Sequence, residues 1–61
     1  RQLVGDEKSV FDAMDDDFKD VESIANVAQL DINSVLVALT MLELDGLCES
    51  GMGKRYRRKQ S

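Results

Sequence analysis

The stretch LDINSVLVALTMLELDGLCESGMGKRYRR, residues 30–58, determines the fold class of this chain. It opens with a turn that ends in Asp31, a residue type that caps helix N-termini well. Apolar residues then recur at helical spacing as far as Gly46, and glycine often ends a helix because it tolerates the left-handed conformation. Residues 47–50 and 54–58 alternate well enough to pair as two strands around the glycine-rich tip 51–53. The stretch therefore predicts a turn, a long helix and a β-hairpin whose second strand is basic.

The long helix, predicted over residues 33–45, has apolar residues on two sides. Projected at 100° per residue, one side gathers the residues that we expect to face the core: Ile32, Val35, Leu36, Leu39 and Leu42. The opposite side carries Thr40 and a set that we name the contact stripe: Asn33, Val37, Met41 and Leu44. Apolar residues on the outer side of a small domain often form a contact surface. The alternative is that part of the stripe is core in a fold that wraps further than expected. We favour the protein-contact interpretation.

The first part of the chain predicts a shorter helix. It begins near Asp6, with Asp6 or Gly5 as its cap, and three acids at 15–17 end it because they oppose the helix dipole. Its apolar face lies at i, i+1 and i+4: Val10, Phe11 and Met14. Phe18 follows as an isolated aromatic residue that suits a first strand or an anchor.

A second helix is expected after Asp20, which would cap it with Ser23 at the third position. Its apolar stripe comprises Val21, Ile24, Ala25, Val27 and Ala28. Three helices followed by a hairpin predict a mainly α fold with a small β-hairpin, the winged helix-turn-helix. We expect a single domain over residues 1–61, with an ordered core of about 6–58 and frayed residues 59–61. Because the chain begins with Arg1 rather than Met, we expect it to be a fragment of a larger protein.

Composition excludes several classes of function. With 61 residues, 43% of them hydrophobic, the chain can bury one small core but cannot hold an enzyme pocket of ordinary volume. It has no His, no spaced set of metal ligands and no phosphate-binding glycine loop, so we expect no enzymatic activity, no metal and no cofactor. No apolar run approaches the roughly 20 residues that span a bilayer, so we expect no membrane partner. The single Cys48 is expected to be a buried thiol in a reducing, cytoplasmic setting.

The charges are divided between the two ends of the chain. Residues 1–50 hold all 12 acidic residues and three basic ones, a net charge of −9, whereas residues 51–61 hold five basic residues and no acid, a net charge of +5. The candidate nucleic-acid residues, which we name the basic wing, are Lys54, Arg55, Tyr56, Arg57, Arg58 and Lys59. Such a wing would neutralise phosphates without reading sequence, and its tyrosine could stack on a base. Two alternatives remain open: a solvated tail held near the acidic body, and a tyrosine that packs within the hairpin.

The helix that would read DNA in a winged helix carries no Lys or Arg here, between residues 33 and 45. Winged helices usually insert this helix into the major groove, where its exposed side contacts base edges and phosphates. Only Asn33 on its outer side could read a base edge well. We therefore expect this domain alone to bind nucleic acid weakly and non-specifically at most.

Two segments resemble a known family. The run LTMLELDGL, residues 39–47, followed by GKRYRR, residues 53–58, is similar to the C-terminal winged-helix domain of the bacterial DNA-processing protein A (DprA, also called Smf). That domain typically shows Leu-Glu-Leu-x-Gly-Leu and then Gly-x-x-Tyr-x-Arg, and residues 21–29 resemble its second helix. The resemblance implies an upstream Rossmann-like domain, outside this chain, that binds single-stranded DNA during natural transformation and helps to load the RecA recombinase.

These observations predict an accessory module of a DNA-processing and recombination protein, acting mainly through protein or interdomain contact and assisted by the basic wing. The expected partners are the upstream Rossmann-like domain of the same chain or another copy, and a RecA-type recombinase. Single-stranded DNA would be reached through the parent protein. Two other interpretations are the DNA-binding domain of a bacterial transcription regulator and a purely structural cap on a larger enzyme.

Overall fold

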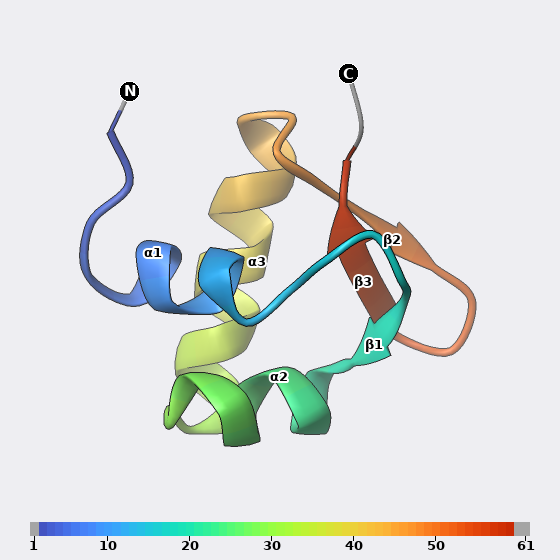
Figure 1. The fold of residues 1–61 in the computed structure, drawn as a ribbon, viewed down its shortest axis with the longest axis horizontal. Helices are drawn as coiled ribbons and strands as arrows, with labels where there is room; N and C mark the ends of the chain where they lie inside the picture. Colours follow the sequence, from blue (N-terminus) through green and yellow to red (C-terminus); the bar gives the residue numbers. More distant parts are fainter. Residues whose placement is uncertain (1, 60–61) are drawn as a thin grey trace.

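Three helices and a three-stranded antiparallel sheet make up the part of the chain that the computed structural model describes, residues 2–59 (Figure 1). In chain order the elements are α1 (Gly5–Asp12), β1 (Lys19–Asp20), α2 (Val21–Ala28), α3 (Ile32–Leu44), β2 (Cys48–Gly51) and β3 (Arg55–Arg58). In Figure 1, α3 stands between α1 on one side and the β2–β3 hairpin on the other, and it contacts both. The predicted fold, mainly α with a small hairpin as wing, is confirmed. The fraying expected for Lys59 was wrong, because its backbone N–H donates to the Leu47 carbonyl at 3.0 Å. The same expectation for residues 60 and 61 lies outside the described residues.

Side-chain caps define the starts of α2 and α3. Asp20 accepts the backbone N–H of Ser23 at 2.7 Å, and Asp31 accepts that of Ser34 at 3.2 Å. Each bond satisfies one of the N–H groups that a helix N-terminus leaves without an intrahelical partner. At its other end α3 is followed by Gly46, whose φ of +75° is the left-handed conformation that glycine tolerates. Both predicted caps and the predicted glycine stop are confirmed.

Helix α1 differs from its prediction at both ends. It begins at Gly5, the residue before it is Val4, and no side chain caps it, so the predicted capping role of Asp6 or Gly5 was wrong. The helix ends at Asp12, before the three acids, so Met14 is not on its face. Met14 is nevertheless buried, because the chain turns back over the core immediately after the helix.

The core lies where the three helices and β2 meet. Its buried side chains are Val10, Ala13, Met14, Val21, Ile24, Ala25, Val35, Ala38, Leu39, Leu42 and Cys48. Two predicted core positions were wrong: Ile32 and Leu36 are each 39% exposed. Val27, a member of the apolar stripe of the second helix, is 67% exposed. Helix α1 packs on the side of α3 that holds Ala38. The buried face of α3 is therefore centred closer to Ala38 than predicted, and Ile32 and Leu36 lie at its exposed edge. These two residues border a shallow hollow beside Tyr56 of the hairpin instead.

The sheet has β3 at its centre, paired with β2 on one side and β1 on the other. The predicted hairpin is confirmed, although its strands and tip are displaced by one residue, with the turn at residues 52–54. Phe18 lies just before the two-residue β1, not within it. A Cβ on Gly51 would stand 2.6 Å from Phe18 Cε1, so a larger residue at this position would have to displace the Phe18 ring.

Cys48 is a buried thiol, as predicted. It is 3% exposed, and its Sγ–H points to the carbonyl of Leu39 at 3.7 Å. Burial, followed by the charges of Glu43 and Glu49, raises its pKa to about 11. The thiol therefore stays protonated and packs as a small apolar group.

No single helix among the described residues is both long and apolar enough to cross a membrane. Helices α2 and α3 reach that length and apolarity only when they are taken together, and the pair is bent by 103°.

Candidate functional site

The contact stripe lies on the solvent side of α3. Val37 is 66% exposed, Met41 40% and Leu44 76%, and Asn33 is also exposed. The opposite side of the same helix is buried through Val35, Leu39 and Leu42. The stripe is therefore surface rather than core in this structure, although Met41 is partly covered. The described residues cover only about a third of Val37 and a quarter of Leu44.

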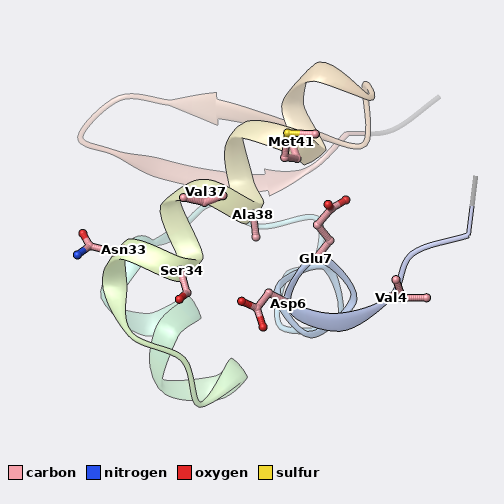
Figure 2. A pocket seen from close by; sticks show the side chains of 8 residues that line it. All are labelled: Val4, Asp6, Glu7, Asn33, Ser34, Val37, Ala38 and Met41. Carbon is pink, nitrogen blue, oxygen red and sulfur yellow. The ribbon is translucent and has the colours of Figure 1, made fainter.

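A groove runs beside the contact stripe, between α1 and α3 (Figure 2). Its volume is about 440 Å³. Asn33, Val37 and Met41 of the stripe line it, whereas Leu44 lies beyond it. The sequence did not indicate its other lining residues, Val4, Asp6, Glu7, Ser34 and Ala38. No local signal could have found them, because the groove arises only when α1 packs against α3.

The groove has an apolar floor and an acidic edge. Figure 2 shows Asp6 and Glu7 on α1 facing the residues of α3. Asp6 is exposed and Glu7 is half-buried, and no lining residue is Lys or Arg. Ser34 is held by Asp31, whose carboxylate also accepts the Ser34 Oγ–H at 2.7 Å. These hydrogen bonds from Ser34 lower the pKa of Asp31, which keeps another negative charge at this end of α3.

The basic wing divides into two groups in the structure. Lys54, Arg55 and Lys59 are exposed, whereas Tyr56, Arg57 and Arg58 are half-buried. Lys54 has a φ of +56° in the turn, so the chain reverses at this residue. Sequence order gave no indication of this division, because basic residues are continuous there apart from Tyr56.

Arg57 is bound within the domain. Its Nε donates to Glu49 Oε2 at 2.6 Å across the β2–β3 pair, and its guanidinium lies 4.4 Å from the centre of the Phe18 ring. Glu49 and Arg57 are directly opposite in the register of the two strands. Cross-strand ion pairs and cation–π contacts both stabilise such a hairpin. Part of the positive charge of the wing is thus neutralised by the domain itself.

Arg58 joins the wing to α1. Its Nε donates to the Phe11 carbonyl at 3.0 Å, and its guanidinium lies 4.3 Å from the centre of the Phe11 ring. Its backbone N–H donates to the Asp15 carbonyl at 2.9 Å. The guanidinium is thus a second donor to the Phe11 carbonyl, which also accepts the Met14 backbone N–H at 3.1 Å, and it places a cation at the C-terminal end of α1, whose last turn has no basic residue.

Tyr56 is packed against the core and is opposite Ser50 and Lys19 in the sheet. Burial, then the negative charge of Glu43 and the neighbouring Cys48, raises the pKa of its hydroxyl. The ring is half-covered by the domain, which supports the packing alternative of the sequence analysis.

Two further features limit the chemistry of the domain. Helix α3 bears no Lys or Arg, and Glu43 lies in its last turn. Among residues 2–59 no three His, Cys, Asp or Glu side chains are grouped so as to hold a metal ion.

In the acidic run, Asp15 accepts the Asp17 backbone N–H at 2.9 Å and pairs with Lys19 Nζ at 3.2 Å. The hydrogen bond from Asp17, followed by that from Lys19, lowers the pKa of Asp15.

Three helices followed by a hairpin wing define a winged helix-turn-helix domain. The family described as the DprA winged helix domain matches residues 1–54. The chain belongs to this family, and the resemblance seen in the sequence is confirmed. In the family this domain is a non-catalytic module of a DNA-processing protein. The comparison with curated proteins and the comparison with solved structures each gave no match.

Proposed function

We propose that this domain is the accessory module through which a DprA-type protein of natural transformation contacts a protein partner. Its membership of the family supports the accessory role. The observation that carries the contact role is the exposure of Val37 and Leu44, 66% and 76%, on a helix without Lys or Arg. Covering such apolar surface stabilises a complex by roughly 25 cal/mol per Å².

The partners that we propose are the upstream Rossmann-like domain of the parent chain, or another copy, and a RecA-type recombinase. Single-stranded DNA would bind the parent protein rather than this domain. The exposed cations of the basic wing, Lys54, Arg55 and Lys59, would add weak, salt-sensitive contacts to phosphates. The cytoplasm is the compartment we propose, because these partners and a free thiol belong there. A transcription regulator is not favoured, because α3 lacks the cations that hold a recognition helix on DNA.

The test of the contact role is a charge placed in the contact stripe. Val37→Glu should weaken docking of the domain to the upstream domain, or its self-association, because burying the new carboxylate would require its desolvation. Sedimentation velocity and chemical-shift changes would measure this loss. Asn26→Glu is the matched control, since it places the same charge on an exposed position of α2, away from the contact stripe.

Val37 serves better here than Met41, because Met41 is only 40% exposed and its replacement would disturb packing as well as contact. Circular dichroism should show both variants folded. If Val37→Glu docks and associates as well as Asn26→Glu does, the stripe is not the contact surface.

A further inference from the structure

We propose that the groove between α1 and α3 binds the wing tip of a second copy, residues 52–55, so that the domains associate head to tail. This inference rests on the contact role proposed above, and it assigns that role a specific partner. The groove and the tip are two surfaces of one chain with opposite chemistry.

The tip presents an apolar side chain flanked by cations. Met52, in the turn between β2 and β3, is 92% exposed, more than any other large apolar residue described. Lys54 and Arg55 follow it and are exposed. Among the described residues neither forms a salt bridge, whereas Arg57 is paired with Glu49. The hydrogen bonds from Ser23, and to a smaller extent the positive charge of Arg55, lower the pKa of Asp20.

The groove presents the complementary features. Val37 and Met41 provide an apolar wall, the small Ala38 is almost fully covered beneath them, and Asp6 and Glu7 edge the opposite side. A volume of about 440 Å³ lies within the range of binding pockets and admits side chains rather than a whole element. Methionine is suited to such a site because its flexible thioether adapts to irregular surfaces. The charges of the two surfaces have opposite sign, which favours this orientation over others.

The tip cannot occupy the groove of its own molecule. In Figure 1 the turn between β2 and β3 lies on the far side of α3 from α1. Contact between them therefore needs two molecules. A contact between different surfaces of identical chains leaves one free groove and one free tip on every dimer, so it extends into open chains unless the geometry closes a ring.

This geometry allows a complementation experiment with two variants of the 61-residue chain. The groove variant is Asp6→Lys with Val37→Glu, and the tip variant is Met52→Ser with Lys54→Glu and Arg55→Glu. The wild-type chain should show a weight-average mass that rises with concentration in sedimentation, and this rise should lessen as salt screens the charges. Each variant alone should remain monomeric. An equimolar mixture should form a 1:1 dimer and nothing larger, because it contains one intact groove and one intact tip for each pair.

The control is Asp16→Lys with Asn26→Glu, which makes the same two types of charge change at exposed positions away from the groove. It should associate as the wild type does. A wild-type chain that stays monomeric at millimolar concentration overturns the proposal, as does a mixture that forms no dimer although both variants are folded by circular dichroism. The contact role is tested separately, by docking to the upstream domain. If the wild-type chain is monomeric but Val37→Glu weakens this docking, the contact role holds and only the head-to-tail association is wrong. If Val37→Glu leaves this docking unchanged, the contact role itself is wrong.

Discussion

Two leucines of α3, two residues apart, provide a matched test of which face of this helix is core. Leu42 is fully buried, whereas Leu44 is 76% exposed. The change Leu→Ala removes the same atoms at both positions and keeps a residue that favours helix. Any difference between the two variants therefore reports their surroundings rather than the substitution.

The expected magnitudes follow from burial. Truncating a buried leucine costs about 2–5 kcal/mol, because the lost contacts leave a cavity. Fully burying a leucine is worth about 1.5–3 kcal/mol, and Leu44 is only about a quarter covered, so Leu44→Ala should cost less than about 0.7 kcal/mol. A chain of 61 residues has a total stability of roughly 3–9 kcal/mol. Leu42→Ala therefore removes a large part of the stability, and Leu44→Ala removes little.

Urea unfolding and thermal melting, both followed by far-ultraviolet circular dichroism, would measure the two costs. For a domain of this size 1 kcal/mol shifts the Tm by about 4–8 °C. Leu42→Ala should lower the Tm by at least about 8 °C or unfold the domain, and Leu44→Ala should lower it by less than about 6 °C. If Leu44→Ala destabilises the domain as much as Leu42→Ala does, Leu44 is core and the contact stripe does not extend to it.

Four other outcomes are expected. Arg58→Met should lower the free energy of unfolding by about 1–2 kcal/mol, because it removes a hydrogen bond and a cation–π contact with Phe11, whereas Arg55→Met should change it little in the same urea titration. Cys48, with a pKa raised to about 11, should react with a maleimide at pH 7.5 only at the rate of unfolding, and immediate labelling of the folded domain would contradict its burial. The pKa of Asp31 is lower in the folded state than its ordinary value of 3.8. The charged carboxylate therefore stabilises the fold at pH values above 3.8, and this stabilisation is lost as the pH falls below 3.8. Asp31→Asn, which keeps a capping side chain, should reduce this acid-induced fall in Tm. Weak binding to single-stranded DNA should be lost in the double variant Lys54→Ala and Arg55→Ala, with the slope of log K against log salt reduced in magnitude by about 1.4, and an unchanged slope would place the phosphate contacts elsewhere.

The sequence itself determined the order of the three helices and the hairpin, the starts of α2 and α3, and the end of α3. Asp20 and Asp31 cap the helices they precede, and Gly46 ends α3, because caps and stops depend on hydrogen bonds and backbone preferences within a few residues. The helical period of residues 32–44 and the alternation around the hairpin tip are equally local. The family resemblance rested on the same segments.

Local rules did not suffice where a residue's environment depended on a distant segment. Helix α1 begins without the expected cap, and its position against α3, rather than its own sequence, decides that Ala38 is buried while Ile32 and Leu36 are partly exposed. Helix α3 has apolar residues on several sides, so its sequence permits more than one buried face. The choice among them depends on how much apolar surface α1 and α2 can cover together.

The candidate surfaces show the same division. The exposure of Val37 and Leu44 was predicted from the wheel of a single helix, since a residue opposite the core face of a small domain has few neighbours that could cover it. The groove was not, because Asp6 and Val37 are distant in sequence and meet only when α1 docks on α3. The sequence also gave no indication of which arginines of the wing are bound within the domain. Arg57 and Arg58 contact the rings of Phe18 and Phe11, which are distant from them in sequence. Period and capping are short-range properties that the chain carries in any conformation, whereas burial, grooves and ring contacts are formed between distant segments and are fixed only by tertiary packing.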